Sequence, residues 1–239
     1  ESAGGFRDIA ISNCVIQRSE AEDRRSGRIE GLAGIALEIV DGGTLERVAI
    51  SNIVIEGTTS PIFMRLGDRG RAPKPSDSEP PVGVFRDVSI SNVVATGASL
   101  LGCPITGIPG HCIENVTLSN IRITFAGGGA AKDAFVKVPE NEDKYPDCTM
   151  FNALPAYGFF IRHVQGLRLN DIVLRYEKPD ARPAIVADDV KDIRLEALDA
   201  AIESSTLATL VFHSVQNASI ADCQNASPTP LLQQDEACK

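Results

Sequence analysis

The main structural signal is a repeated segment, first seen as Phe6-Arg-Asp-Ile-Ala-Ile-Ser-Asn13-Cys-Val-Ile16. The clear copies are Leu45-Glu-Arg-Val-Ala-Ile-Ser-Asn52-Ile-Val-Ile55, Phe85-Arg-Asp-Val-Ser-Ile-Ser-Asn92-Val-Val94 and Ile113-Glu-Asn-Val-Thr-Leu-Ser-Asn120-Ile-Arg-Ile123. Weaker copies begin at Val164, Val190 and Val215, so the steps between copies are 39, 40, 28, 51, 26 and 25 residues. A period of about 20–50 residues is typical of stacked or radial repeat architectures.

Each copy predicts two short strands joined by a bend. Apolar residues alternate at Ile9 and Ile11 and resume at Val15, after Ser12-Asn13. Alternation with a period of two indicates strands with one buried face. Asn tolerates left-handed backbone geometry better than other residues except Gly, so it can bend the chain between the two strands. Asn side chains at the same place in successive repeats can also stack as a hydrogen-bonded ladder.

A third strand fits between the copies. It is expected at Gly34–Ile39, Ile62–Leu66, Gly158–Arg162, Ala184–Ala187 and Leu207–Phe212. Three strands in each turn of about 25 residues match a parallel β-helix, whereas a β-propeller needs about 40 residues for each blade. No stretch of helical length shows a 3.6-residue stripe, which excludes helical solenoids. We therefore predict an all-β, single-domain parallel β-helix over residues 1–239.

Three insertions break the period, at residues 18–30, 67–83 and 125–157. Each stands beside a third strand. We expect them to rise beside one sheet and to wall a groove, because function tends to be carried by loops on a rigid scaffold. The alternative is that they are surface loops without a role in binding.

Composition excludes several classes of protein. The 239 residues carry a net charge of −9, are 43% hydrophobic and 23% charged, and include no Trp. This is globular composition. Apolar runs are too short for a membrane-spanning helix. The chain has no basic block and few aromatic residues, so we expect neither a nucleic acid nor a membrane as partner.

The six cysteines leave two interpretations open. Cys103 with Cys112 and Cys223 with Cys238 are close enough in sequence for disulfides that bridge loops. Free thiols are the alternative, because unpaired Cys is also common in buried strands. The cysteines alone do not identify the compartment.

Several motifs resemble the C-terminal portion of glycoside hydrolase family 28, the polygalacturonase-like enzymes that degrade pectin. The resemblance runs over nearly the whole chain and is closest to the bacterial-type members. Its motifs are Gly34-Ile-Ala-Leu-Glu-Ile-Val-Asp-Gly-Gly43, Pro61-Ile-Phe-Met-Arg-Leu-Gly67, Ile105-Thr-Gly-Ile-Pro-Gly-His-Cys-Ile-Glu-Asn-Val116, Leu154-Pro-Ala-Tyr-Gly158 and Lys178-Pro-Asp-Ala-Arg-Pro-Ala184. The resemblance implies a right-handed parallel β-helix.

The resemblance also implies an activity, namely hydrolysis of glycosidic bonds in pectic polysaccharide with inversion. Inversion needs an acid and a base whose carboxyl groups are about 6.5–9.5 Å apart. In the family these come from Asn-Thr-Asp and Asp-Asp motifs, helped by Gly-His-Gly, all of which precede the repeat that Phe6 opens. We expect the catalytic residues upstream of Glu1, so that residues 1–239 are N-terminally truncated and inactive alone.

The same resemblance implies the surroundings of the protein. We expect a pectic polysaccharide or oligosaccharide as partner, a monomer when full length, and an extracellular or periplasmic location. No cofactor and no metal ion is expected.

Two motifs in the sequence are similar to the catalytic Gly-His-Gly and Asp-Asp motifs but do not match them in position. Pro109-Gly-His111-Cys112 comes too late in the chain and lacks the second Gly of Gly-His-Gly. We interpret His111 as a turn residue or part of the groove wall. Asp188-Asp189 follows a late strand and opens a repeat copy, which favours a turn.

Glu38 is the first candidate for sugar binding. Family members carry Arg-Ile-Lys on the groove strand after the first repeat here, and their cations hold a galacturonate carboxylate. The matching positions read Ala36-Leu37-Glu38. A carboxylate facing a uronate is repulsive, so we expect a neutral sugar such as rhamnose, whose hydroxyls can donate to Glu38. The alternative is an ion pair between Glu38 and a neighbouring Arg.

Arg65 and Tyr157 are further candidates for substrate binding. If Ile62 and Met64 point inward, alternation places Arg65 on the groove side, where its fork can bind carboxylates or hydroxyls. The alternative for Arg65 is an ion pair with Asp68 or Glu38. Tyr157 can stack on a sugar or pack its loop. His163 and His213 are interpreted as structural.

A second class of function stays open, a non-catalytic carbohydrate-binding or structural β-helix module. A polysaccharide lyase on the same scaffold ranks last, because the third strands show no cluster of Asp for a calcium ion.

Overall fold

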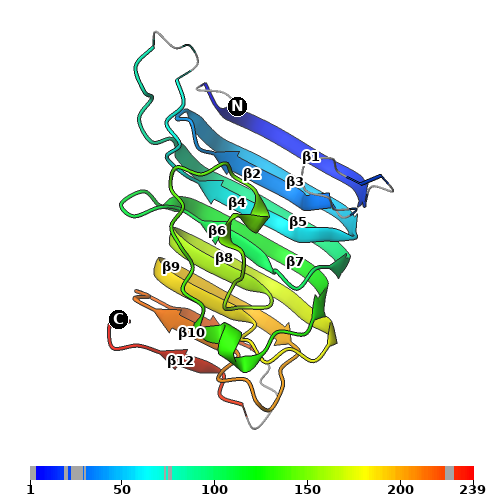
Figure 1. Cartoon of the computed structure of the whole chain (residues 1–239). Helices are drawn as coiled ribbons and strands as arrows, with labels where there is room; N and C mark the ends of the chain where they lie inside the picture. Colours follow the sequence, from blue (N-terminus) through cyan, green and yellow to red (C-terminus); the bar gives the residue numbers. More distant parts are fainter. Residues whose placement is uncertain are drawn as a thin grey trace.

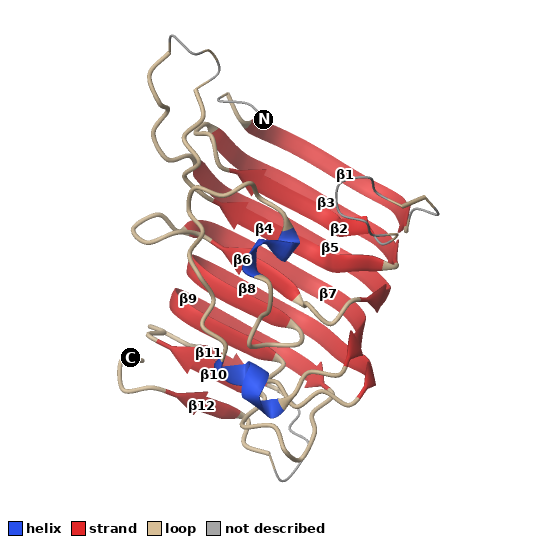
Figure 2. Ribbon diagram, viewed as in Figure 1, coloured by secondary structure: helices blue, strands red, loops and turns tan. Residues whose placement is uncertain are grey.

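The computed structural model of the chain describes residues 4–18, 21–22, 29, 31–72, 74, 77–223 and 229–239. Most of the insertion expected at 18–30 lies outside these residues. Over them the chain is all-β, with two short 3-10 helices and no α-helix (Figures 1 and 2). The elements are β1 (Phe6–Gln17), β2 (Gly31–Ile39), β3 (Thr44–Glu56), β4 (Thr58–Leu66), β5 (Val84–Ala98), β6 (Cys103–Thr106), β7 (Ile113–Gly127), η1 (Ala131–Phe135), η2 (Cys148–Phe151), β8 (Phe159–Lys178), β9 (Ile185–Ala200), β10 (Leu210–His213), β11 (Ser219–Ala221) and β12 (Leu232–Gln234).

Successive repeats pair as parallel strands in the register that the sequence aligned. Phe6 of β1 lies beside Leu45 of β3, which lies beside Phe85 of β5. β7 follows β5, β8 follows β7, and Val164 of β8 lies beside Val190 of β9. All the paired strands are parallel, and Figure 1 shows them stacked in chain order. The predicted repeat is confirmed as a parallel sheet of many strands.

Asparagine bends each repeat, as predicted. Asn13, Asn52, Asn92 and Asn120 have φ values of 59, 57, 54 and 52°. Their side chains form a ladder in which each Nδ2 donates to the Oδ1 of the preceding repeat, at 3.0, 2.9 and 2.8 Å. The same residue type therefore supplies both the left-handed backbone and the contact between repeats.

The predicted third strands are present, and the sequence missed one more. They form β2, β4, β10 and the beginnings of β8 and β9. The missed strand is β6, whose Cys103-Pro-Ile-Thr106 pairs with both β4 and β8. Four residues that include a Pro give little pattern to recognise. Without β6 the third strands would be interrupted between β4 and β8.

The six cysteines, all within the described part of the chain, are free thiols. This settles the alternative that the sequence left open, and neither Cys103–Cys112 nor Cys223–Cys238 is a disulfide. Cys103 is buried in the interior, where burial raises the pKa of its thiol to about 12. The interior is otherwise built from the alternating apolar residues of the repeats.

The Asn ladder generates a prediction for Asn92. Asn92→Ala should lower the free energy of unfolding by about 2 kcal/mol, because Ala is strained at this φ and two ladder hydrogen bonds are lost. Asn92→Gly keeps the backbone free of strain and should lose about half as much. Urea unfolding of the two variants measures the difference. Equal losses would show that the left-handed backbone contributes nothing.

Candidate functional site

The third strands carry two rows of outward-facing side chains in register across β2, β4, β6, β8, β9 and β10. We call this surface the short-strand face. One row is polar and consists of Glu38, Arg65, Thr106, Arg162, Asp188 and His213. The other is mostly apolar and consists of Ala36, Phe63, Pro104, Phe160, Val186 and Val211. The predicted alternation is confirmed, since Ile62 and Met64 lie in the interior and Phe63 lies outside it.

The insertion 128–158, between β7 and β8, lies across this face instead of beside it (Figures 1 and 2). Its Phe151 and Leu154 form a second buried cluster with Phe63 and Phe160 of the apolar row. The expectation that this insertion walls an open groove is wrong for the middle of the face, which the insertion covers, although the insertion lines depressions at both ends. The physical reason is the outward apolar row, which would be exposed to water without a cover.

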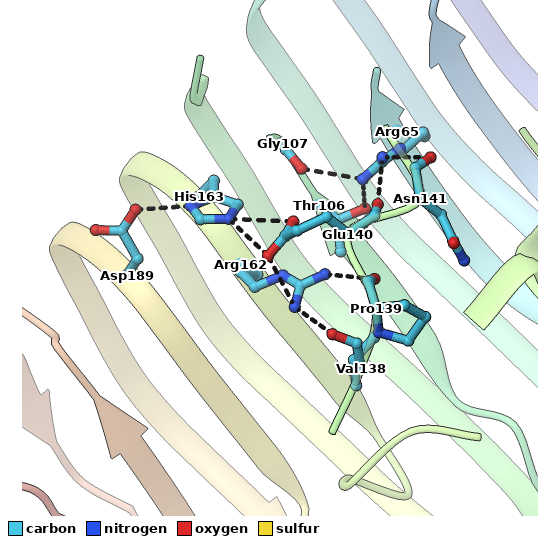
Figure 3. A network of polar contacts seen from close by, with 10 residues as sticks. All are labelled: Arg65, Thr106, Gly107, Val138, Pro139, Glu140, Asn141, Arg162, His163 and Asp189. Atoms are coloured by element: carbon cyan, nitrogen blue, oxygen red, sulfur yellow. Dashed lines mark hydrogen bonds and ion pairs between the residues drawn. The ribbon is translucent and has the colours of Figure 1, made fainter. Parts of the chain in front are cut away.

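Arg65 lies beneath residues 138–141 of the insertion, which we call the strap. It is 0% exposed. Its Nη1 donates to Thr106 Oγ1 at 3.2 Å and to the Gly107 carbonyl at 3.0 Å. Its Nη2 donates to the carbonyls of Glu140 at 2.7 Å and Asn141 at 3.1 Å (Figure 3). Burial, and then the charge of Arg162, lowers the pKa of Arg65 to about 10.

These contacts correct the expectation that Arg65 faces an open groove. The alternation put it on the right face, but the strap covers that face. The alternative ion pairs with Asp68 or Glu38 are also absent, because within the described chain the Arg65 guanidinium binds a hydroxyl and backbone carbonyls. Arg65 therefore holds the strap and is not available to a sugar.

Arg162, the next arginine of the polar row, binds the same strap. Its Nη1 donates to the Val138 carbonyl at 2.7 Å, and its Nη2 donates to the Pro139 carbonyl at 2.9 Å. The Glu140 carboxylate lies 3.2 Å from Nη1. The two arginines thus bind four consecutive carbonyls, from 138 to 141 (Figure 3).

His163 joins the strap to β9. Its Nδ1 lies 2.7 Å from Asp189 Oδ2 and its Nε2 lies 3.3 Å from the Glu140 carboxylate (Figure 3). The side chain is buried. This arrangement agrees with the interpretation of His163 as structural. Asp189 has a φ of 51°, so the backbone turns here as expected for Asp188-Asp189.

Tyr157 packs its loop and is not available for stacking on a sugar. It is 0% exposed and belongs to the interior. Its hydroxyl donates to the Ala201 carbonyl at 2.8 Å, and its ring meets the rings of Phe125 and Tyr176 edge-on. Burial raises the pKa of this phenol well above its ordinary value. The expectation that Tyr157 contacts a sugar is therefore corrected, and the alternative that it packs its loop holds.

Glu38 remains accessible at the first end of the polar row. It lines two depressions of about 160 and 550 Å³, both shared with Tyr145 and Pro146. No described residue makes an ion pair or hydrogen bond with its carboxyl group, so the alternative pairing with an Arg is not formed. Burial, and then the charge of Asp147, raises the pKa of Glu38 to about 7.

Tyr145 and a buried ion pair complete this end, and sequence reasoning missed them. Asp41 accepts from Nε of Arg69 at 2.9 Å, and Arg69 lies 5.4 Å from the centre of the Tyr145 ring. The Arg69 contact lowers the pKa of Asp41. The charges of Asp41 and Arg69 therefore compensate each other. Tyr145 is 59% exposed beside Glu38. Tyr145 belongs to an insertion without periodicity, so no sequence signal pointed to it.

The remaining candidates have other roles or none. His111 is exposed and pairs with Ile108 in a tight turn, as interpreted. Over the residues described, no group of three or more His, Cys, Asp or Glu side chains is placed to hold a metal ion. The same part of the chain contains no helix long and apolar enough to cross a membrane.

Comparisons with protein-family models, with curated proteins and with solved structures found no match to this chain. The resemblance to glycoside hydrolase family 28 is therefore carried only by the motifs quoted above.

The strap generates a prediction for Arg65. Arg65→Met should lower the free energy of unfolding by about 3 kcal/mol, because buried carbonyls lose a charged donor. Hydrogen exchange of amides in the insertion should rise as well. The control is Arg122→Met, since Arg122 is half-exposed in a surface pair with Asp171 and should change stability by less than about 1 kcal/mol. Equal effects of the two variants would contradict the anchoring role.

The raised pKa of Glu38 generates a prediction for pH dependence. The folded state keeps the proton of Glu38 up to about pH 7, whereas the unfolded chain releases it near 4.5. Glu38 therefore lowers stability progressively as the pH rises from 4.5 to 7. Glu38→Gln should raise the melting temperature more at pH 8 than at pH 5. The control is the exposed Glu177→Gln, and an equal gain from Glu38→Gln at both pH values would refute the assignment.

Proposed function

We propose that residues 1–239 are the sugar-binding C-terminal part of a polygalacturonase-like glycoside hydrolase that acts on pectic polysaccharide. Their fold would be the right-handed parallel β-helix of family 28. The main support is the position of Glu38, a half-buried carboxyl group without a partner, beside the exposed ring of Tyr145. A hydrogen-bonding carboxyl next to an aromatic face suits a sugar, which presents hydroxyls at its rim and C–H groups on its faces.

The parallel repeats support the β-helix. β8 is one strand, but its first residues pair with β6 and its later residues pair with β7. β6 and β7 follow each other in the chain, so the two are neighbouring sides of one turn on which β8 is stacked. β9 stacks on β8 in the same way, with its first and later residues paired to the first and later residues of β8. A solenoid requires that each turn stack on the one before it.

The sugar at Glu38 would be neutral. Glu38 occupies the position at which, by the resemblance, family members carry a cationic side chain that holds galacturonate. The Glu38 carboxylate has the opposite charge. When ionised, Glu38 repels a uronate and accepts from the hydroxyls of a rhamnose residue. Arg69 does not change this balance, because its guanidinium is held by Asp41.

The chemistry of hydrolysis falls to residues that the resemblance places before Glu1. Residues 1–239 would hold one part of the polysaccharide, while an acid protonates the leaving oxygen and a base activates water. The second candidate is a non-catalytic carbohydrate-binding module. The strap favours it, because the strap closes the middle of the short-strand face. Release of reducing sugar ends from pectin by the full-length protein distinguishes the two candidates.

Sugar binding at Glu38 is tested by NMR titration of the chain with methyl α-rhamnoside and with methyl α-galacturonide. At pH 8 the rhamnoside should bind more tightly than the galacturonide. Lowering the pH to 5.5 should reduce the difference in affinity between the two glycosides, because Glu38 takes up a proton and no longer repels the uronate. Glu38→Gln and Tyr145→Ala should each weaken rhamnoside binding about tenfold.

Glu177→Gln, which changes an exposed carboxyl group of β8, serves as the matched control and should leave binding unchanged. Tighter binding of the galacturonide at pH 8, or rhamnoside binding that is insensitive to both variants, would exclude Glu38 as a contact for neutral sugar.

A further inference from the structure

A second pocket lies at the opposite end of the polar row, beyond the strap. Its volume is about 400 Å³, a size suited to one or two sugar residues. Phe160 and Val186 line its apolar part, and Asp188 and His213 line its polar part together with Arg162. Residues 134–138 of the insertion form one wall. The floor is therefore divided into an apolar and a polar half, as the two rows of the face dictate.

Among the described residues, Asp188 is the acceptor without a partner on this floor. It lies in register between Arg162 of β8 and His213 of β10. Its carboxyl group makes no hydrogen bond or ion pair with any residue that the structure describes. Burial raises the pKa of Asp188, although Arg162 acts in the other direction. Asp188 is thus a partly desolvated acceptor without a donor.

Arg162 is a further polar residue of the same pocket. Its Nη atoms bind the strap, but its Nε is buried without an acceptor in the described chain. The residue is 4% exposed and lines the pocket. Because almost none of the Arg162 guanidinium is exposed, the Asp188 carboxyl group is the acceptor in this pocket that a sugar hydroxyl can reach.

Phe135 stands at the rim of the pocket. It ends η1 and is 69% exposed, more than any other large hydrophobic side chain among the residues that the structure describes. Tyr145 has the same relation to Glu38 at the other end of the row, and both rings belong to the insertion that carries the strap. Each end thus combines an exposed ring, a half-buried carboxyl group without a partner and a neighbouring arginine.

We propose that the pocket at Asp188 and Phe135 is a second saccharide site, which takes a neutral glycosyl residue whose hydroxyls donate to Asp188. The choice of ligand class rests on the proposed function. A neutral residue is favoured because the Arg162 charge is already engaged by the strap carbonyls and Glu140, so no buried cation is free for a uronate.

The two sites are separate. Glu38 and Asp188 lie four strand steps apart in the polar row, which corresponds to about 19 Å. Between them the strap occupies the face above Arg65 and Arg162. A polysaccharide therefore cannot lie straight along the row from one site to the other, and each site binds its own segment or chain.

NMR titration of the intact chain with methyl α-rhamnoside tests the second site. We expect saturable shifts at the amides of Phe135, Lys137, Asp188 and His213. Phe135→Ala and Asp188→Asn should each weaken binding at this site about tenfold. Tyr145→Ala is the matched control, since it removes an equally exposed ring from the same insertion and should leave this site unchanged.

The outcomes separate the two proposals. Shifts at Asp188 that survive Tyr145→Ala but not Phe135→Ala support the second site, whether or not the Glu38 amides respond. Shifts confined to the Glu38 end, or an affinity at Asp188 that neither Phe135→Ala nor Asp188→Asn changes, overturn it. Failure at the Glu38 end alone excludes only Glu38 as a contact for neutral sugar and leaves the second site standing. The exposed position of Phe135 keeps its variant folded, so loss of binding there is not loss of structure.

Discussion

Two buried guanidinium groups organise the outer surface of this protein. Arg65 and Arg162 stand in one row of a parallel sheet and bind the carbonyls of four consecutive strap residues. A guanidinium group is costly to bury, and the row of carbonyls, joined at Arg162 by the Glu140 carboxylate, offsets that cost. The arrangement fixes residues 138–141 over the middle of the short-strand face. Everything proposed about ligands follows from which parts of that face the strap leaves open.

The repeats could be predicted from sequence because their determinants are local. A left-handed Asn such as Asn52 bends the chain where the alternation breaks, and it contacts its counterpart one repeat away. Each copy of the pattern therefore carries its own backbone bend and its own strand faces. The strand β6 was missed for the opposite reason, since Cys103-Pro-Ile-Thr106 is too short for a pattern and is defined by its neighbours β4 and β8.

The candidate site was predicted only in part. Alternation put Arg65 on the outer face, yet whether that face is open depends on an insertion 75 residues further along the chain. Tyr157 was ambiguous for the same reason, because its partner Ala201 is distant in sequence. Glu38 stayed accessible because it lies beyond the strap. Tyr145 and Phe135, which flank the open ends, belong to segments without periodicity and became visible only in three dimensions.

The strap divides the short-strand face and leaves an accessible carboxyl group and an exposed ring at each end. A crystal structure of the chain soaked with a rhamnose-containing pectic oligosaccharide would reveal this division. We expect sugar density against Glu38 and Tyr145, separate density against Asp188 and Phe135, and an undisturbed strap over Arg65. Continuous sugar density across Arg65, with the strap displaced, would contradict this division.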